Sequence, residues 1–262
     1  MNRQKIAEWA RARGLHTRPE FRTVFDLIAS GAKPKLLTSS VKTRKGEKYG
    51  ILTGIQYLAP ASESGIQVCP WHSAGCASAC LGHSSGRMRI PAHKVSRILR
   101  TWWAFGDRPS YRQVLLAELQ AIVRRGKKHD MAVFVRLNGT SDLPIDFFLP
   151  EKERAQFKHT IRFYDYTKYA IRAEYPPADV HYTFSRSETT CDDTCRRLLS
   201  AGRNVAVVFA GPLPETYLGF RVEDGDDSDA RPSDARGVVI GLSPKGPLAK
   251  RDMSGFVVRT GA

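Results

Sequence analysis

The apolar positions of this chain predict helices at its start and in its middle. The first part carries two stripes at three- and four-residue spacing, beginning at Ile6 and at Phe21. Two longer amphipathic segments follow, VSRILRTWWAFG and YRQVLLAELQAIVRRG, each with a glycine at its end, where helices commonly stop. We therefore expect an N-terminal helical extension over residues 1–34 and two long helices further along the chain.

The second half of the chain switches to short apolar runs. They alternate with helix-compatible segments, which is the pattern of a parallel α/β sheet. With an earlier run at Gly54–Ala59, they predict a partial parallel α/β barrel of about six strands over residues 35–262. KPKLLTSSV and YGILTGIQYLAPA flank KTRKGEK, whose Lys-Gly-Glu centre favours a turn, so a β-hairpin extension should precede the barrel. The later strands are predicted at MAVFVRL, IRFYDYT, VHYTFS, RNVAVVFAG and GVVIGLS.

A long loop rich in serine, glycine and cysteine follows the first predicted strand, over residues 60–90. Long irregular segments inside a domain are commonly functional. The sequence CPWHSAGCASACLGH spaces Cys69, Cys76 and Cys80 as C-x6-C-x3-C. Thiolates select zinc or iron–sulfur clusters, and structural zinc prefers four ligands in close Cys-x-x-Cys pairs. The three cysteines therefore favour a 4Fe-4S or 3Fe-4S cluster.

Zinc is the alternative at this loop, with His72 or His83 as a further ligand. The other two of the five cysteines, Cys191 and Cys195, would lie on one face of a predicted helix. Either of them could supply a fourth cluster ligand, or both could be small buried residues or a free thiol pair. An odd number of cysteines in a reducing compartment favours metal binding over structural disulfides.

Polar residues follow several of the predicted strands at their carboxyl ends, where α/β folds place their chemistry. Asp142, Asp165 and Lys168 are predicted to transfer protons, because carboxylates and amines are common general acids and bases. Hydrogen-bonding groups at the same ends are predicted to hold a substrate or cofactor: Asn138, Ser141, Ser185 and Lys245.

The chain carries 41 lysines and arginines against 26 aspartates and glutamates, a formal charge of +15. A basic surface attracts polyanions because bound phosphates release counterions, so DNA or RNA is a predicted partner. Trp71, Trp102 and Trp103 would then supply base stacking, although the last two also suit the core of a helix. The sequence has no apolar run of membrane-spanning length and no apolar stretch after its basic N-terminus, so we expect a cytoplasmic protein.

An acidic segment, DGDDSD, places Asp224, Asp226, Asp227 and Asp229 close together. Oxygen ligands at this density suit Mg²⁺ or Ca²⁺. The pattern of an EF-hand is incomplete, because the flanking helices and the final glutamate are missing. A solvated turn that pairs with basic side chains is the other interpretation.

An ordered set of motifs runs along the chain: YGILTGIQYLAP, CPWHSAGCASACLG, RLNGTSDLP, FYDYTKY, NVAVVF, DGDDSDARPSDARGVVIGLSPKG and GFVV. Together they resemble the bacteriophage protein family called gene product 88. The resemblance covers roughly residues 35–258 and implies a phage or prophage origin, with the host cell cytoplasm as location, but no particular activity. A looser architectural similarity links the cysteine loop and predicted barrel to radical S-adenosylmethionine enzymes, whose cysteines follow C-x3-C-x2-C.

These observations lead to three hypotheses, of which the third is a zinc-stabilised accessory phage protein. In the first, the chain is an iron–sulfur enzyme whose open iron binds a substrate or S-adenosylmethionine, with a nucleic acid or nucleotide as substrate. In the second, it is a non-catalytic nucleic-acid-binding protein whose cluster or zinc ion is structural.

Overall fold

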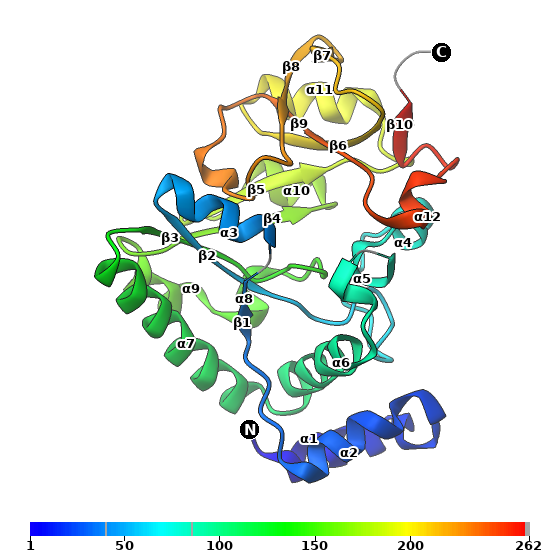
Figure 1. The fold of residues 1–262 in the computed structure, drawn as a ribbon, viewed down its shortest axis with the longest axis vertical. Coiled ribbons are helices and arrows are strands. Elements are labelled where there is room, and N and C mark those ends of the chain that lie inside the picture. The colour runs from blue at the N-terminus through cyan, green and yellow to red at the C-terminus, as the bar shows by residue number, and fades with distance from the viewer. Residues whose placement is uncertain (40, 85, 260–262) are drawn as a thin grey trace.

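The computed structural model describes residues 1–39, 41–84 and 86–259, in which ten strands form one mixed sheet. The order along the sheet is β1-β2-β3-β4-β5-β6-β9-β8-β7, and β10 pairs with β6 beside this path. All neighbours from β2 to β8 in this order are parallel. Parallel neighbours need long crossovers, and helices supply most of them here (Figure 1).

Strand and helix bounds follow the chain in order. The strands are β1 (Leu37–Thr38), β2 (Ile51–Gln56), β3 (Ala132–Arg136), β4 (Arg162–Thr167), β5 (Val180–Ser185), β6 (Val205–Ala210), β7 (Thr216–Tyr217), β8 (Phe220–Asp224), β9 (Val239–Leu242) and β10 (Val257–Arg259). The α-helices are α1 (Arg3–Arg11), α2 (Arg22–Ser30), α3 (Val41–Lys45), α4 (Ala74–Ser78), α5 (Leu81–Ser84), α6 (Pro91–Gly106), α7 (Arg108–Lys128), α8 (Ile145–Phe148), α9 (Glu151–Arg154), α10 (Ala170–Glu174), α11 (Asp192–Ser200) and α12 (Gly246–Lys250).

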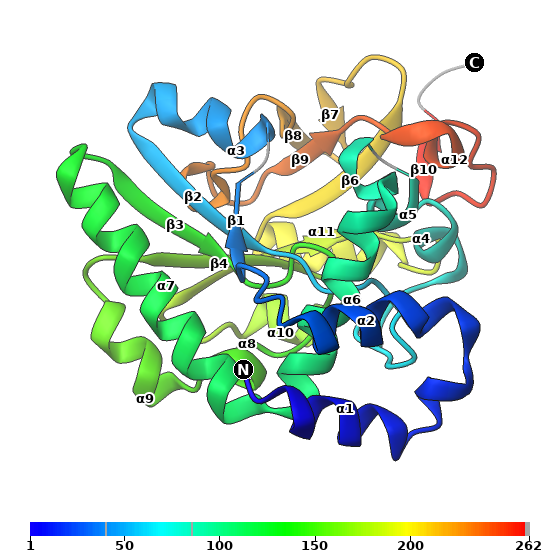
Figure 2. The same ribbon diagram turned by 60° about the horizontal axis from the view of Figure 1, so that its bottom comes forward.

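Side chains alternate cleanly between the two faces of the sheet, as the two-residue period of a strand requires. Val133 and Val135 of β3 belong to the main core, together with Leu115 and Leu119 of α7. Phe134, between the two valines, packs instead with Tyr164 and Ala230 in a separate cluster on the opposite face. Figure 2 shows α7 and α9 on one side of the strands and α3 on the other. Both faces of the sheet are therefore covered.

The N-terminal helices pack onto the rest of the molecule through Trp102 of α6. Phe21 and Phe25 meet its indole edge-on, each with ring centroids 5.2 Å away. Phe21 and Trp102 are fully buried and lie in the main core. Figure 1 shows α1 and α2 beside α6 at the lower end of the molecule. The predicted helical character of this segment is confirmed.

The five later strands predicted from apolar runs are confirmed as β3, β4, β5, β6 and β9. The first, predicted at Gly54–Ala59, forms three residues earlier as β2 (Ile51–Gln56). The sheet is open in the described part of the chain, because its end strands β1 and β7 each pair with a single neighbour. The protein is thus a mixed α/β fold with a large open sheet.

The predicted β-hairpin was wrong in its connection. The strands β1 and β2 do pair antiparallel, with Leu37 opposite Gln56. KTRKGEK, between them, forms α3 and a following 3-10 helix, Gly46–Tyr49, instead of a tight turn. Its lysines, arginine and glutamate are good helix formers, and this preference outweighs the turn signal of one glycine.

Candidate functional site

The three loop cysteines follow β2, and two short helices shape their segment. Ser73 caps the N-terminus of α4, where its hydroxyl accepts a hydrogen bond of 3.2 Å from the amide of Cys76. Cys80 directly precedes α5. All three side chains are partly buried. The segment predicted as irregular therefore contains short helices that set the spacing of its thiols.

The thiols of Cys69, Cys76 and Cys80 share one electrostatic environment. Burial, together with negative charge on Cys80 or Cys76, raises the pKa of Cys69 to about 12. Burial also raises the pKa of Cys80 to about 11 and that of Cys76 above its ordinary value. Lys168 acts in the opposite direction on Cys76, and Arg97 on Cys80. Three buried thiols that interact through their charges would become thiolates together only with further positive charge beside them.

The described residues form no preorganised site for a single metal ion in this region. Among the described residues, no three histidine, cysteine, aspartate or glutamate side chains converge closely enough to hold one ion. A cluster makes a different geometric demand, because each thiolate binds a different iron and the ligands do not meet at one point.

Asn138 and Asp165 join the ends of β3 and β4. The carboxylate of Asp165 accepts hydrogen bonds from the Asn138 amide at 2.9 Å and from its side-chain Nδ2 at 3.1 Å. The Asn138 Oδ1 accepts in turn from the Ser141 hydroxyl at 2.7 Å. Burial raises the pKa of Asp165 to about 7, although Arg136 lies 3.7 Å away and opposes the shift. A carboxyl group with this pKa exchanges protons near neutral pH.

The turn after β3 needs a glycine. Gly139 donates its amide to the carbonyl oxygen of Gln56 at 2.8 Å, and a Cβ there would lie 2.5 Å from the same oxygen. Asn138-Gly139 is thus a close backbone approach between β3 and the end of β2, as well as part of the site.

Asp142, Lys168 and Ser185 join the ends of β3, β4 and β5. The Lys168 amide donates to Asp142 Oδ2 at 2.8 Å, and Arg172 Nη1 donates to Asp142 Oδ1 at 2.5 Å. The Lys168 ammonium donates to the hydroxyl and the carbonyl of Ser185, at 3.1 and 3.2 Å, and to the carbonyl of Arg186 at 3.3 Å. This ammonium is held in place by three oxygens beside Cys76.

The structure brings six of the seven predicted strand-end residues together and places Lys245 elsewhere. Its ammonium pairs with Asp226 Oδ2 at 2.7 Å, in the acidic segment. Asp227 of that segment accepts from the Tyr49 hydroxyl at 3.0 Å and pairs with Lys48. The acidic segment therefore pairs with basic side chains, as its second interpretation holds.

The remaining predicted ligands have other neighbours. Cys195 is buried in α11, where Arg186, Asp192 and Cys191 act on its pKa, which burial raises to about 11. His72 Nδ1 lies 2.6 Å from the carbonyl oxygen of Cys69, and His83 pairs with Glu63.

Sequence reasoning missed two charged residues that hold the cysteine loop. Glu188, after β5, accepts from the Ser73 hydroxyl and the Gly75 amide, each at 2.7 Å. Arg97 of α6 is almost fully buried and donates to the carbonyl oxygen of Gly82 at 2.9 Å. Arg97 stands out only as a charged residue on the apolar face of a predicted helix, and Glu188 gives no signal in the sequence.

The tryptophans divide into two kinds. Trp102 and Trp103 are buried in the main core, which confirms their interpretation as core residues of a helix and leaves them no role in base stacking. Trp71 in the cysteine loop has 48% of its surface exposed.

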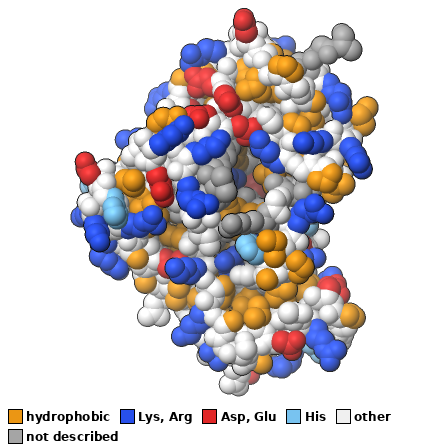
Figure 3. All heavy atoms as spheres, viewed as in Figure 1, with side chains coloured by type: hydrophobic (Ala, Val, Ile, Leu, Met, Phe, Trp, Pro, Cys, Tyr) orange, Lys and Arg blue, Asp and Glu red, His pale blue; other side chains and the backbone are white. Residues whose placement is uncertain are grey.

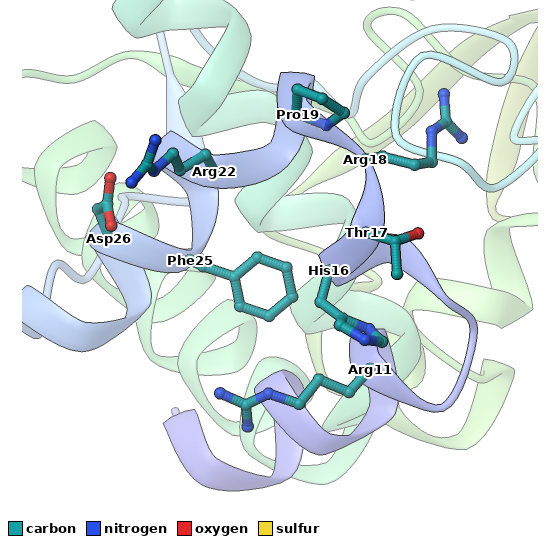
Figure 4. A pocket seen from close by; sticks show the side chains of 8 residues that line it. All are labelled: Arg11, His16, Thr17, Arg18, Pro19, Arg22, Phe25 and Asp26. Atoms are coloured by element: carbon teal, nitrogen blue, oxygen red, sulfur yellow. The ribbon is translucent and has the colours of Figure 1, made fainter.

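The basic side chains on the molecular surface do not gather into one patch on the face shown in Figure 3. Figure 3 shows lysine and arginine side chains scattered over the visible face, with several acidic ones near β8 and β9. An open hollow of about 430 Å³ lies between α1 and α2, where Figure 4 shows Phe25 beside His16 and Arg11. None of the predicted site residues lines this hollow. No helix in the described ranges has the length and apolar character needed to cross a bilayer.

Comparison with known proteins identifies the family of the chain. The model of the family described as gene product 88 matches residues 30–260, which include every strand and every residue of the strand-end set. No curated protein and no solved structure matches, so the similarity to radical S-adenosylmethionine enzymes stays a prediction. The match leaves out α1 and most of α2 but spans the whole sheet. Because it covers most of the chain, the chain belongs to the phage gene product 88 family.

Proposed function

We propose that this chain is an iron–sulfur enzyme that acts on a nucleic acid or a nucleotide. Cys69, Cys76 and Cys80 would hold a 4Fe-4S or 3Fe-4S cluster at the mouth of a partial α/β barrel. The observation that carries the proposal is the shared environment of the three buried thiols beside the carboxyl ends of the parallel strands. The protein would work in the cytoplasm of the host cell.

The donor set fits such a cluster chemically. Three thiolates bring three negative charges into a partly buried space, and iron ions offset them. Lys168 adds positive charge beside Cys76, and Arg97 adds it beside Cys80. Short helices and the Glu188 contacts fix the loop before any iron is bound. The cluster would supply electron transfer, and in its 4Fe-4S form the iron without a cysteine ligand would offer a binding position for substrate or S-adenosylmethionine.

The strand-end residues would bind substrate and move protons. Asp165 has a raised pKa of about 7, which suits a group that gives and takes a proton at neutral pH. Asp142 is the second candidate, since burial raises its pKa while Arg172 keeps it oriented. Asn138, Ser141 and Ser185 offer hydrogen-bonding groups at the same edge of the sheet. Lys168 would hold charge beside Cys76.

A non-catalytic nucleic-acid-binding protein with a structural cluster or zinc ion is the second candidate. The formal charge of +15 and the exposed Trp71 favour nucleic acid as partner without requiring turnover. In this case Asp142 and Asp165 would serve only the packing of the strand ends.

The decisive experiment is anaerobic purification with quantitation of iron and acid-labile sulfide. We expect both in the wild-type protein, and their loss in Cys69→Ser, Cys76→Ser and Cys80→Ser. Cys191→Ser is the matched control and should keep both, because this thiol is exposed and hydrogen-bonded to Thr194. Paramagnetic resonance that changes on adding S-adenosylmethionine would support the enzyme over the binding protein. One zinc ion per chain and no sulfide would contradict the cluster.

A further inference from the structure

The cysteine loop carries an exposed aromatic stack. The rings of Trp71 and Tyr169 lie with their centroids 4.2 Å apart and their planes 9° from parallel. Trp71 has 48% of its surface exposed, whereas Tyr169 is half-buried. Among the described residues, this is the one ring contact that Trp71 makes. Tyr169 covers one face of the indole, and about half of Trp71 is in contact with solvent, where a flat ligand would bind.

The backbone fixes both partners of the stack. Pro70 and Trp71 are the central residues of a turn closed by a 3.1 Å hydrogen bond from the His72 amide to the Cys69 carbonyl. Proline favours this position because its φ is already set. The Tyr169 amide donates to the Thr167 hydroxyl at 3.1 Å, where β4 ends. Backbone hydrogen bonds therefore hold the main chain in place at both Trp71 and Tyr169.

Charged residues support the stack from the inner side. The Arg172 guanidinium lies 5.8 Å from the centre of the Tyr169 ring and is held by Asp142 at 2.5 Å. A cation over an aromatic ring and an ion pair of this kind restrict the tyrosine further. The order Arg172, Tyr169, Trp71 thus leads outward from the strand ends to solvent.

The stack adjoins the thiols. Trp71 lies two residues from Cys69, and Tyr169 follows Lys168, whose ammonium acts on Cys76. A flat ligand on the indole would be bound beside the loop that carries all three cysteines. The chain's charge of +15 favours a ligand that carries phosphate.

We propose that Trp71, backed by Tyr169, is a stacking platform for a nucleobase beside the cysteine loop. The nucleobase would come from single-stranded nucleic acid or from a free nucleotide, since every base presents a flat π face. This inference rests on the proposed function for its substrate class, and it adds the residue that recognises the substrate and the part that is recognised.

Fluorescence anisotropy with the full-length chain tests the platform. The probes are a labelled oligothymidylate and the same strand with abasic sites, which keeps the phosphates and removes the bases. Trp71→Ala should weaken binding of the oligothymidylate by about 5- to 150-fold, the range for one stacked base. The affinity of Trp71→Ala for the abasic strand should equal that of the wild-type protein. Trp71→Phe should keep more affinity than Trp71→Leu, because phenylalanine retains a π face.

Tyr175→Ala is the matched control, since Tyr175 is an exposed aromatic residue at the end of α10 with 73% exposure. It should bind like wild type. Efficient competition by thymidine monophosphate would identify a free nucleotide as the source, and weak competition would identify a strand. Equal affinity of Trp71→Ala and wild type for oligothymidylate, or no binding by wild type, would overturn the platform.

Iron and sulfide content of the same preparations separates this inference from the proposed function. Binding that depends on Trp71 in a protein without iron would keep the platform and reject the cluster. An intact cluster in a protein whose oligothymidylate binding does not depend on Trp71 would keep the cluster and reject the platform.

Discussion

The carboxylate of Glu188 accepts a hydrogen bond of 2.7 Å from the hydroxyl of Ser73, across 115 positions of sequence. The same carboxylate accepts from the Gly75 amide, and Ser73 in turn accepts from the Cys76 amide. A chain of contacts thus runs from the end of β5 to the second cysteine. These hydrogen bonds and neighbouring positive charge keep the pKa of Glu188 below its usual value despite its burial.

Under the proposed function, removing this carboxylate should weaken binding of the cluster, although the cysteines stay in place. We expect Glu188→Ala to lower the affinity for iron by about 10- to 100-fold, as the loss of outer contacts to ligands commonly does. Glu188→Gln should show a smaller loss, because one acceptor oxygen remains. Iron and sulfide per chain are the measurement. Glu215→Ala, which removes an exposed carboxylate, should leave both unchanged. Equal content in Glu188→Ala and wild type would show that the loop is held without this contact.

Arg172 should stabilise the strand ends through its ion pair with Asp142. Both side chains are nearly buried, with 12% and 9% of their surface exposed. Arg172→Ala would leave a buried carboxylate without its partner, so we expect the free energy of unfolding to fall by about 3 kcal/mol. The free energy of unfolding of Arg172→Lys should fall less, since lysine keeps the positive charge although it lacks the planar guanidinium.

Urea denaturation at neutral pH measures these differences. Arg124→Ala, at an exposed position of α7, is the control and should change stability by less than about 0.5 kcal/mol. A similarly small change in Arg172→Ala would mean that Asp142 is neutral in the folded protein or finds another cation.

The strands were predictable from the sequence because the sheet is covered on both faces. Runs such as MAVFVRL are apolar at nearly every position, and this signal is local. The tendency of α/β folds to place functional residues at the carboxyl ends of strands then predicted that Asn138, Asp142 and Asp165 lie in one site. They do so because neighbouring parallel strands end at the same edge of the sheet.

The rest of the site depends on contacts between distant segments. Glu188 and Arg172 have no local signal, since their partners lie 115 and 30 positions away. Lys245 fitted the same tendency as Lys168, but its strand β9 lies next to the acidic loop, whose Asp226 binds it. Charge pairing between loops decided this position, and a sequence pattern does not show which loops meet.

Asp165 should make stability depend on pH between about 4 and 7. Burial raises its folded pKa from 3.8 to about 7, so the folded chain binds this proton more tightly than the unfolded chain. The resulting stability is complete below pH 4 and is lost as the pH rises to 7, by roughly 4 kcal/mol at about 1.4 kcal/mol per pKa unit.

The difference in free energy of unfolding between wild type and Asp165→Asn isolates this group from other titrating residues. We expect wild type to lose stability relative to the variant as the pH rises from 4 to 7, whatever the offset between the two proteins. The offset itself reflects the hydrogen bonds to Asn138. A difference that stays constant with pH would show that Asp165 is ionised throughout, held by Arg136.

The N-terminal helices should unfold together with the sheet, although α1 and most of α2 lie outside the family match. Phe21 is fully buried against Trp102, in the same core as the residues of α7 and β3. Phe21→Ala should therefore lower the free energy of unfolding by about 3 to 5 kcal/mol and keep one cooperative transition. Leu248→Ala, at a half-exposed position of α12, should change it by less than about 0.5 kcal/mol. If the helices formed a separate unit, Phe21→Ala would leave the main transition in place and add an earlier one, visible when circular dichroism and tryptophan fluorescence are followed during the same denaturation.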